Sequence, residues 1–378
     1  MVYLDNNATT PLDPAVIQKM TSFLKQHFGN PSSLYPIGQQ VKAMITEARE
    51  QVALAIGAHR SEVIFTGSGT ESDNLAILSV LEAQPGKKEF ITSAIEHPAV
   101  LETARFLEKK GYLVHYVPVD AHGVIDLNFL RSAISSSTGL VSIMLANNEI
   151  GTIQPIEEVT KIASNYGVPV HTDAVQAFGK IEVEVKRLGV DLLTVSAHKV
   201  YGPKGVGALY LKKGTPFSPV IHGGHQEFCL RPGTENTIGI IGFGEAARVL
   251  QERWKNDRDR LGKLAQKLKD GIEKQIPGLK FNGPPEKRVR STLNFTFEGV
   301  EGEALLLALA TKEIYVSTGS ACSEESEEPS HVLLAIGLTP EEANSSIRIS
   351  LGRFNEEKDV EIVLAELPAI IEELRELA

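Results

Sequence analysis

The most informative stretch for the fold is Val63-Ile64-Phe65-Thr66-Gly67-Ser68-Gly69-Thr70. Val63 to Phe65 is a short apolar strand, the glycines break it, and a helix follows over 70–81. Amide groups at such a helix start point to one place, together with the positive helix end, and favour an anion such as a phosphate. A plain turn with a capping box from Ser68 to Glu71 explains the pattern equally well. No Gly-Lys-Ser/Thr follows, so the stretch is not a P-loop.

The alternation of strand and helix continues on both sides of this stretch. Further strands are expected at 90–93, 112–117, 141–146, 168–172, 192–195 and 207–211. Helices are expected at 13–26, 41–56, 99–109, 128–135 and 156–166. This order predicts an α/β fold with a mostly parallel central sheet and helices on both faces.

The pattern changes after about Gly242. A long charged helix is expected over 246–275, and it contains the single tryptophan, Trp254. Strands at 291–297 and 347–351 and helices at 303–310 and 356–377 follow. The change in character indicates a domain boundary near 250–260.

Composition excludes several classes of protein. Of the 378 residues, 48 are acidic and 38 basic, which gives a formal charge of -10 and argues against binding to nucleic acid or an anionic membrane. Neither a membrane-spanning apolar run nor a signal peptide is visible in the sequence. The two cysteines, Cys229 and Cys322, exclude a disulfide framework and a multi-cysteine zinc site, and they fit a reducing cytosol.

Two charged residues follow apolar strands, where open parallel sheets bind their ligands. Asp173, in His171-Thr-Asp173-Ala-Val-Gln176, needs a cationic partner if it is buried: a metal, an arginine or a protonated heterocycle. A helix-capping role is the alternative. Lys199, in Ser196-Ala-His198-Lys199, could be a desolvated amine that forms a Schiff base, whereas most lone lysines are solvated surface residues.

Cys322 lies in the polar stretch 317–331, among four nearby glutamates. These neighbours disfavour a resting thiolate, so a nucleophilic Cys322 would be activated when it reaches its target. We interpret Cys229, which has no comparable surroundings, as structural. His97 could act as a general acid or base, and Arg348 could clamp a carboxylate; a structural histidine and a surface ion pair are the alternatives.

Taken together, these motifs resemble the cysteine desulfurases, which are pyridoxal-phosphate enzymes of aminotransferase class V with fold type I. The resemblance covers essentially the whole chain, and the motifs occur in the family's order. They are Asp5-Asn-Asn-Ala-Thr, Gly29-Asn-Pro-Ser-Ser, Thr70-Glu-Ser-Asp-Asn, Glu96-His-Pro, Asn147-Asn-Glu-Ile-Gly, His171-Thr-Asp-Ala-Val-Gln, Ser196-Ala-His-Lys and Gly319-Ser-Ala-Cys. The resemblance implies a large cofactor domain at 14–255 and a smaller α+β domain formed by 1–13 together with 256–378.

The resemblance also implies a role for each site residue. Lys199 would bind the aldehyde of pyridoxal 5'-phosphate, and Asp173 would pair with the ring nitrogen, which makes the ring an electron sink. His97 would stack on the ring and move protons. Asn148 and Gln176 would lie near the ring hydroxyl and the substrate, and Arg348 would bind the substrate carboxylate. The phosphate would be held by Gly69, Thr70, Ser196 and His198, joined by Thr234 from the second subunit of a homodimer.

The implied reaction converts L-cysteine to L-alanine and leaves a persulfide on Cys322. The sulfur would pass to an acceptor or iron–sulfur scaffold protein in the cytoplasm, for cluster assembly or tRNA thiolation, and Cys322 could ligate a nascent cluster. The alternatives are a selenocysteine lyase, another fold type I enzyme, or a catalytically silent protein that docks sulfur carriers. Two departures from the family are visible: Tyr35 stands where histidine is usual, and the chain stops at Ala378 without a longer tail, so the mode of scaffold docking stays open.

Overall fold

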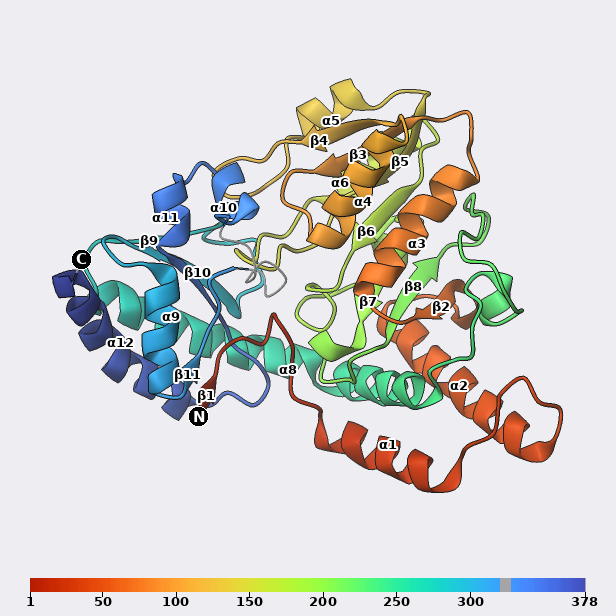
Figure 1. Ribbon diagram of the computed structural model, residues 1–378, viewed down its shortest axis with the longest axis horizontal. Helices are drawn as coiled ribbons and strands as arrows, with labels where there is room; N and C mark the ends of the chain where they lie inside the picture. The colour runs from red at the N-terminus through yellow and green to blue at the C-terminus, as the bar shows by residue number, and fades with distance from the viewer. Residues whose placement is uncertain (320–327, 378) are drawn as a thin grey trace.

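A seven-stranded sheet forms the centre of the protein, described here from a computed structural model that covers residues 1–319 and 328–377 (Figure 1). Its strand order is β2-β8-β7-β6-β5-β3-β4. The strands are β2 (Val63–Thr66), β3 (Glu89–Ser93), β4 (Leu113–Val117), β5 (Thr138–Ser142), β6 (Val170–Asp173), β7 (Leu192–Ser196) and β8 (Gly207–Leu211). β8 is antiparallel to both its neighbours and the other pairs are parallel, so the predicted mostly parallel sheet is confirmed.

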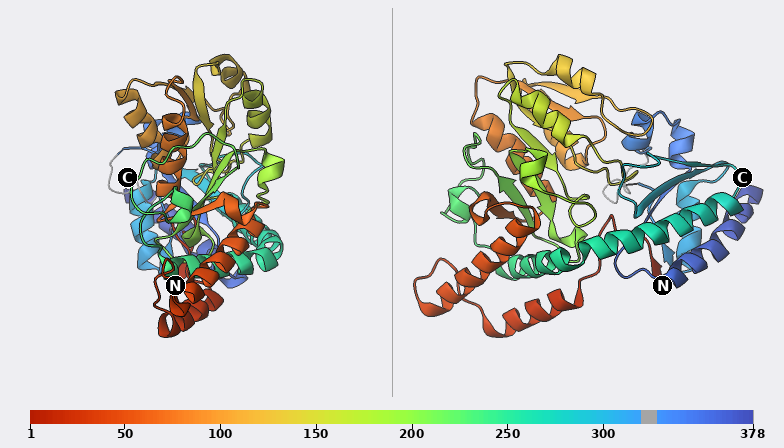
Figure 2. Two further views of the ribbon diagram at one scale, coloured as in Figure 1. Left: turned by 90° about the vertical axis from the view of Figure 1, so that its right-hand side faces the viewer. Right: turned by 180° about the vertical axis from the view of Figure 1, so that it is seen from behind.

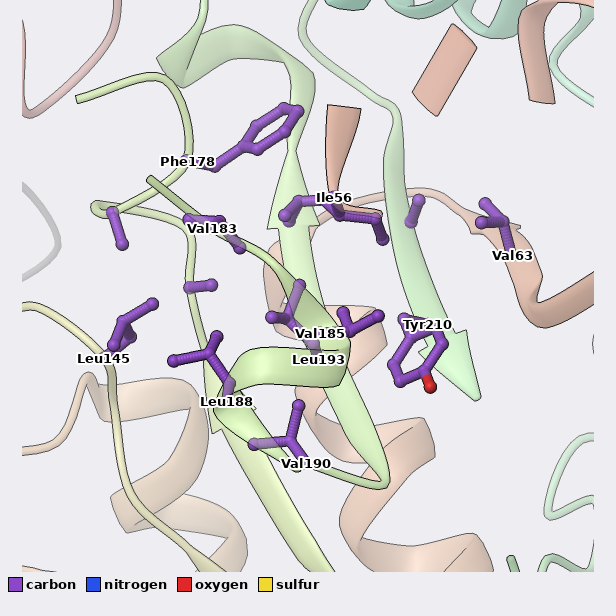
Figure 3. Packing of buried hydrophobic residues seen from close by; sticks show 14 of the residues in the cluster. Ile56, Val63, Leu145, Phe178, Val183, Val185, Leu188, Val190, Leu193 and Tyr210 are labelled. Carbon is purple, nitrogen blue, oxygen red and sulfur yellow. The ribbon is translucent and has the colours of Figure 1, made fainter. Parts of the chain in front are cut away.

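Helices cover both faces of this sheet because successive strand residues point to opposite sides. Phe90 packs with α3 (Gly69–Glu82) and α4 (Pro98–Lys109), whereas its neighbour Ile91 packs into the cluster on the other face. That second cluster contains side chains from α2 (Pro36–Ala55), α5 (Leu127–Ala133), α6 (Ile156–Ser164), α7 (Val185–Leu188) and α8 (Thr237–Gln275). Figure 3 shows part of it, where Leu188 and Val190 lie beside Leu193 of β7.

A smaller unit lies at the other end of α8 and contains both chain termini (Figures 1 and 2). It holds the antiparallel sheet β12-β10-β9 and the parallel pair β1-β11. The strands are β1 (Val2–Tyr3), β9 (Leu279–Phe281), β10 (Thr292–Phe297), β11 (Ile314–Tyr315) and β12 (Ser346–Ser350). The helices are α9 (Gly302–Thr311), α10 (His331–Ala335), α11 (Pro340–Asn344) and α12 (Glu357–Leu377); α1 (Pro14–Gln26) lies outside this unit, against α8.

Several expected boundaries differ from the structure, among them the start of the helix expected at 41–56, which begins at Pro36, and two of the differences have clear physical reasons. α8 begins at Thr237 and not at 246, because Asn236 caps it and its early glycines are needed for packing. A Cβ on Gly244 would stand 2.5 Å from the Cα of Ala48 in α2, so the glycine permits the close contact between the helices. β5 covers 138–142 and not 141–146; the chain beyond it leaves the sheet to form the site.

α8 contributes to both hydrophobic cores. Ile240 and Leu250 pack in the core of the large sheet, and Leu261 and Leu268 pack in the core of the smaller unit together with Leu4 from the N-terminal segment. The predicted division between residues 255 and 256 falls within this continuous helix and stays a prediction. Across the described part of the chain, none of the helices combines the length and the apolar composition that crossing a membrane requires.

Candidate active site

The candidate site lies beyond the carboxyl ends of neighbouring strands, as the sequence predicted. Asp173 is the last residue of β6 and Ser196 the last of β7. The adjacent β5 runs on towards Asn148, and β3 leads to His97, which caps α4. These strands are consecutive in the sheet, so their side chains converge at one edge.

One end of the site is the N-terminus of α3. The Ser68 hydroxyl accepts a hydrogen bond from the Glu71 amide, while the amides of Gly69 and Thr70 donate to no other residue in the described parts of the chain. A Cβ on Gly69 would lie 3.1 Å from the Val175 side chain, so glycine lets this turn approach the strand ends closely. The two amides and the nearby Ser196 form an arrangement that suits a phosphate.

Asp173 lies deep in this edge. Its Oδ1 accepts a hydrogen bond from the Val175 amide at 2.8 Å, and Oδ2 accepts none from any residue in the ranges 1–319 and 328–377. Burial raises the pKa of Asp173 to about 6, partly offset by the Val175 amide and the positive charge of Lys199. A cationic partner at Oδ2 would lower this pKa again, so the carboxylate suits a protonated ring nitrogen.

A second buried acid, Asp73 of α3, lies behind Asp173. Its Oδ1 is 3.6 Å from Nε2 of His171, whose other ring nitrogen is 2.8 Å from the Ser142 hydroxyl. Burial raises the pKa of Asp73 well above its usual range, and the neighbouring charge of Asp173 adds to the effect. Burial lowers the pKa of His171 to about 3, so its imidazole is neutral near pH 7.

Lys199 lies in a short 3-10 turn, η2 (Ala197–Lys199), directly after β7. Its Nζ donates to the backbone carbonyls of Asn7 and Ala8, each at 2.6 Å. His198 is anchored to the same N-terminal segment, since its Nδ1 lies 3.1 Å from the Thr9 hydroxyl. Burial and Lys199 lower the pKa of His198 to about 4.

His97 is held as a neutral imidazole. Its Nδ1 accepts a hydrogen bond from the Ala99 amide at 3.1 Å, which places the remaining proton on Nε2. Burial, Lys199 and His331 lower the pKa of His97 to about 4. Beside it, Glu96 accepts hydrogen bonds from the Ser93 hydroxyl and the Met144 amide, and burial raises its pKa to about 8.

Arg348, in β12, brings a buried cation into the site from the smaller unit. Its side chain is 1% exposed and donates to Asp5 at 2.6 Å and to the carbonyl of Asn148 at 3.3 Å. The Nε of Arg348 is buried and has no partner within the described residues. The alternative, an ion pair on the surface, is therefore wrong, and the spare donor suits a carboxylate.

Sequence reasoning missed two residues that tie the site together. Asn7 connects Gln176, Lys199 and the carbonyl of Asn148, and Lys180 donates to Asn7 and to the side chain of Gln176. Asn7 stands in a motif that carried the family resemblance, but its role depends on contacts between distant segments. No feature of the sequence indicated a role for Lys180, since it does not directly follow a strand and belongs to none of the quoted motifs.

The structure does not test the roles predicted for three residues. Cys322 lies outside the described residues, but both flanks of its segment are anchored near the site: Ser317 pairs with Arg348, and the Ser330 hydroxyl donates to Glu149 at 2.5 Å. Thr234 is exposed, so its predicted role across a dimer stays a prediction. Cys229, interpreted as structural, is exposed, with Sγ 3.5 Å from Nδ1 of His225.

The residues present fit pyridoxal 5'-phosphate. The site offers a primary amine at Lys199, an uncommitted carboxylate oxygen at Asp173, and a neutral imidazole at His97. The α3 amides beyond Gly69, whose missing Cβ permits close approach, form the anion end. No group of three or more histidine, cysteine or acidic residues that could hold a metal ion occurs among the described positions.

Comparison with known proteins defines the class. Residues 2–363 match the family Aminotransferase class-V. The chain is 47% identical over 380 residues to the cysteine desulfurase IscS of Clostridium botulinum, strain Hall, covering 100% of this chain and 96% of that protein. It is 50% identical to IscS of Dictyoglomus turgidum (100% and 96%) and 44% identical to the cysteine desulfurase NifS of Azotobacter vinelandii (100% and 94%).

A solved structure of a NifS-like protein has the same fold, with a TM-score of 0.92, 41% identity and coverage of 98% of this chain and 99% of that one. The fold is thus that of a class-V aminotransferase. Within that class the chain belongs to the cysteine desulfurase family. The predicted fold class and family are confirmed, and with them the dependence on pyridoxal 5'-phosphate.

Proposed function

We propose that the chain is a pyridoxal-phosphate-dependent cysteine desulfurase that converts L-cysteine to L-alanine and places the sulfur on Cys322. The observation that carries the proposal is the convergence of Asp173, Lys199 and His97 at the carboxyl ends of adjacent strands. The match over the full length to proteins named cysteine desulfurase supports the same conclusion.

The chain's residues divide the task of holding the cofactor. The phosphate is bound by the amides of Gly69 and Thr70 together with Ser196 and His198. Thr234 of a second subunit completes this phosphate-binding site. Asp173 pairs with the ring nitrogen, His97 covers the ring face, and Asn148 and Gln176 border the ring hydroxyl. When bound, pyridoxal 5'-phosphate withdraws the electron pair left on the substrate's α-carbon.

Arg348 and Lys199 act on the substrate itself. The guanidinium of Arg348 binds the carboxylate of L-cysteine, which orients the α-carbon towards Lys199. The Lys199 amine removes the α-proton, and its carbonyl contacts with Asn7 and Ala8 position it beforehand. Asn148 supports the same carboxylate through its link to Arg348.

Cys322 takes the sulfur. Its thiolate attacks the substrate sulfur, so an S–S bond forms as the C–S bond breaks. The electron pair of the C–S bond stays with the substrate carbon, which is protonated to give L-alanine. We assign to His97 the movement of protons in this step: its Nε2 carries a proton that it can donate, and after that donation the same nitrogen can accept the proton that Cys322 loses. The persulfide passes to a sulfur-acceptor or iron–sulfur scaffold protein in the cytoplasm, and Cys322 can ligate the nascent cluster there.

The experiment is turnover by purified protein loaded with pyridoxal 5'-phosphate. We expect an absorbance change on adding L-cysteine, release of alanine, and a persulfide found on Cys322 by mass spectrometry. Faster turnover of selenocysteine than of cysteine would favour the lyase alternative. A protein that takes up no cofactor and releases no alanine would refute the proposal and favour a silent docking protein.

A further inference from the structure

Lys180 is a partly buried lysine that the proposed reaction does not use. Its Nζ donates to Oδ1 of Asn7 at 2.5 Å and to Oε1 of Gln176 at 2.6 Å. A lysine held away from water usually pairs with an anion, yet both of these acceptors are neutral amide oxygens. No carboxylate among the described residues accepts a hydrogen bond from Lys180, and Asp5 acts on it only as a nearby charge.

Asn7 connects Lys180 to Lys199. The Asn7 carbonyl accepts from Nζ of Lys199 at 2.6 Å, and the Asn7 side-chain oxygen accepts from Nζ of Lys180. The Asn7 amide nitrogen is committed elsewhere, to the Asn148 carbonyl and the Thr292 hydroxyl, both at 2.9 Å. Because these bonds leave the Asn7 amide one orientation, its oxygen is aimed at Lys180.

Further charges surround the two lysines from several elements. Lys180 faces Lys199 of η2, Arg348 of β12 and Asp5 of the N-terminal segment. Lys199 also faces Asp173 of β6, His97 of α4 and His198 of η2. A cavity of about 30 Å³, room for one water, is lined by both lysines together with the charged side chains of Asp257, Arg258, Arg290 and Arg353.

This set of groups disfavours two ammonium ions side by side. Burial and the charges of Lys199 and Arg348 lower the pKa of Lys180 well below its usual range, and Asp5 opposes this only in part. Like charges in a desolvated site each lower the other's pKa.

We propose that Lys180 is a positioning residue for Lys199: it holds the Asn7 side chain so that the Asn7 carbonyl accepts the Lys199 amine, and it keeps a second amine close to Lys199. The consequence is that Lys199 is available as an unprotonated amine, the form needed to bind an aldehyde and to accept a proton. This inference rests on the proposed function, since it assigns Lys180 to the chemistry of Lys199.

The experiment follows the absorbance of the cofactor bound to Lys199 as the pH is changed in the loaded protein. In Lys180→Met and Lys180→Gln, the midpoint of the titration should rise by about one pH unit, because the competing cation is gone. In Lys180→Arg, which keeps a charge, the midpoint should equal that of the wild type or lie below it. The exposed Lys186→Met is the matched control and should titrate like the wild type.

A structural role alone would change stability without moving the midpoint. The proposal is overturned if the folded neutral variants titrate like the wild type, or if Lys180→Arg shifts upward as they do. Two neutral variants are used so that loss of folding in one still leaves a measurement. Alanine release by the wild-type protein tests the proposed function separately, because a failure there leaves the comparison of midpoints readable.

Discussion

Arg348 and Asp5 lie 343 residues apart in the chain, yet the guanidinium of Arg348 donates to the Asp5 carboxylate across 2.6 Å. Arg348 is buried in β12, and Asp5 sits on the N-terminal segment that crosses the end of the same strand. This pair orients the guanidinium and leaves its Nε for another acceptor. We take that acceptor to be the substrate carboxylate.

Arg348→Ala should therefore raise KM for L-cysteine more than it lowers cofactor content. A hydrogen bond to a charged group is worth about 1.5–3 kcal/mol, so KM should rise about tenfold to a hundredfold. Steady-state kinetics and the absorbance of bound cofactor measure the two quantities. Arg260→Ala, which removes an arginine that caps the carbonyls of Arg353 and Asn355, is the control for loss of a structural arginine. An unchanged KM in Arg348→Ala would remove Arg348 from the substrate site.

Lys199→Ala should abolish turnover, because the proposed reaction needs this amine both to bind the cofactor aldehyde and to take the α-proton. The phosphate and ring contacts should still retain cofactor, without the absorbance band of the lysine-bound form. Spectra before and after dialysis, together with an alanine assay, check both points. Alanine release by this variant without an added amine would contradict the assignment.

Asp173→Asn should lower kcat by about tenfold to a hundredfold or more, because a neutral amide no longer favours a protonated ring nitrogen. The side chain keeps its size and its bond from the Val175 amide, so the fold should persist. Single-turnover absorbance measurements separate slow chemistry from weak cofactor binding. A rate near that of the wild type would show that Asp173 serves only as a cap.

Glu96 should make stability depend on pH. Its pKa is raised from 4.5 to about 8 in the folded state, so between these values the folded protein keeps a proton that the unfolded chain releases. The free energy of unfolding should therefore fall as the pH rises from 4.5 to 8, by up to about 5 kcal/mol from this group. Glu96→Gln should flatten that slope in urea unfolding, whereas the exposed Glu102→Gln should leave it unchanged. Equal slopes in all three proteins would show that Glu96 is ionised when folded.

Substitutions of the two cysteines should have different effects on activity. Cys322→Ser should keep bound cofactor and still change its absorbance with L-cysteine, but it should release neither alanine nor transferable sulfur. Cys229→Ser should turn over like the wild type. Alanine assays and thiol-labelling mass spectrometry compare the variants directly. Normal turnover by Cys322→Ser, or a persulfide on Cys229, would overturn the assignment of the nucleophile.

Much of the site could be predicted because its signals are local. Asp173 and Lys199 each follow an apolar strand within a few residues, and parallel strands end at one edge of a sheet. The residues of the turn at Gly69 likewise predict that a helix begins there. Such patterns depend on backbone preference and on the alternation of side chains, which short stretches of sequence carry.

Other features could be decided only by the tertiary structure. Gly244 of α8 looks like a helix breaker until α2 packs against it, since the close approach of Ala48 is what favours a residue without a Cβ. The neutral state of Glu96 depends on complete burial, which arises when β3, β5 and α10 assemble around it. The sequence by itself determined the fold class, the family and the strand-end residues, because those depend on local pattern. The Arg348–Asp5 pair and the Lys180–Asn7–Lys199 linkage depend on segments far apart in the chain, and only folding places their charges in one desolvated site.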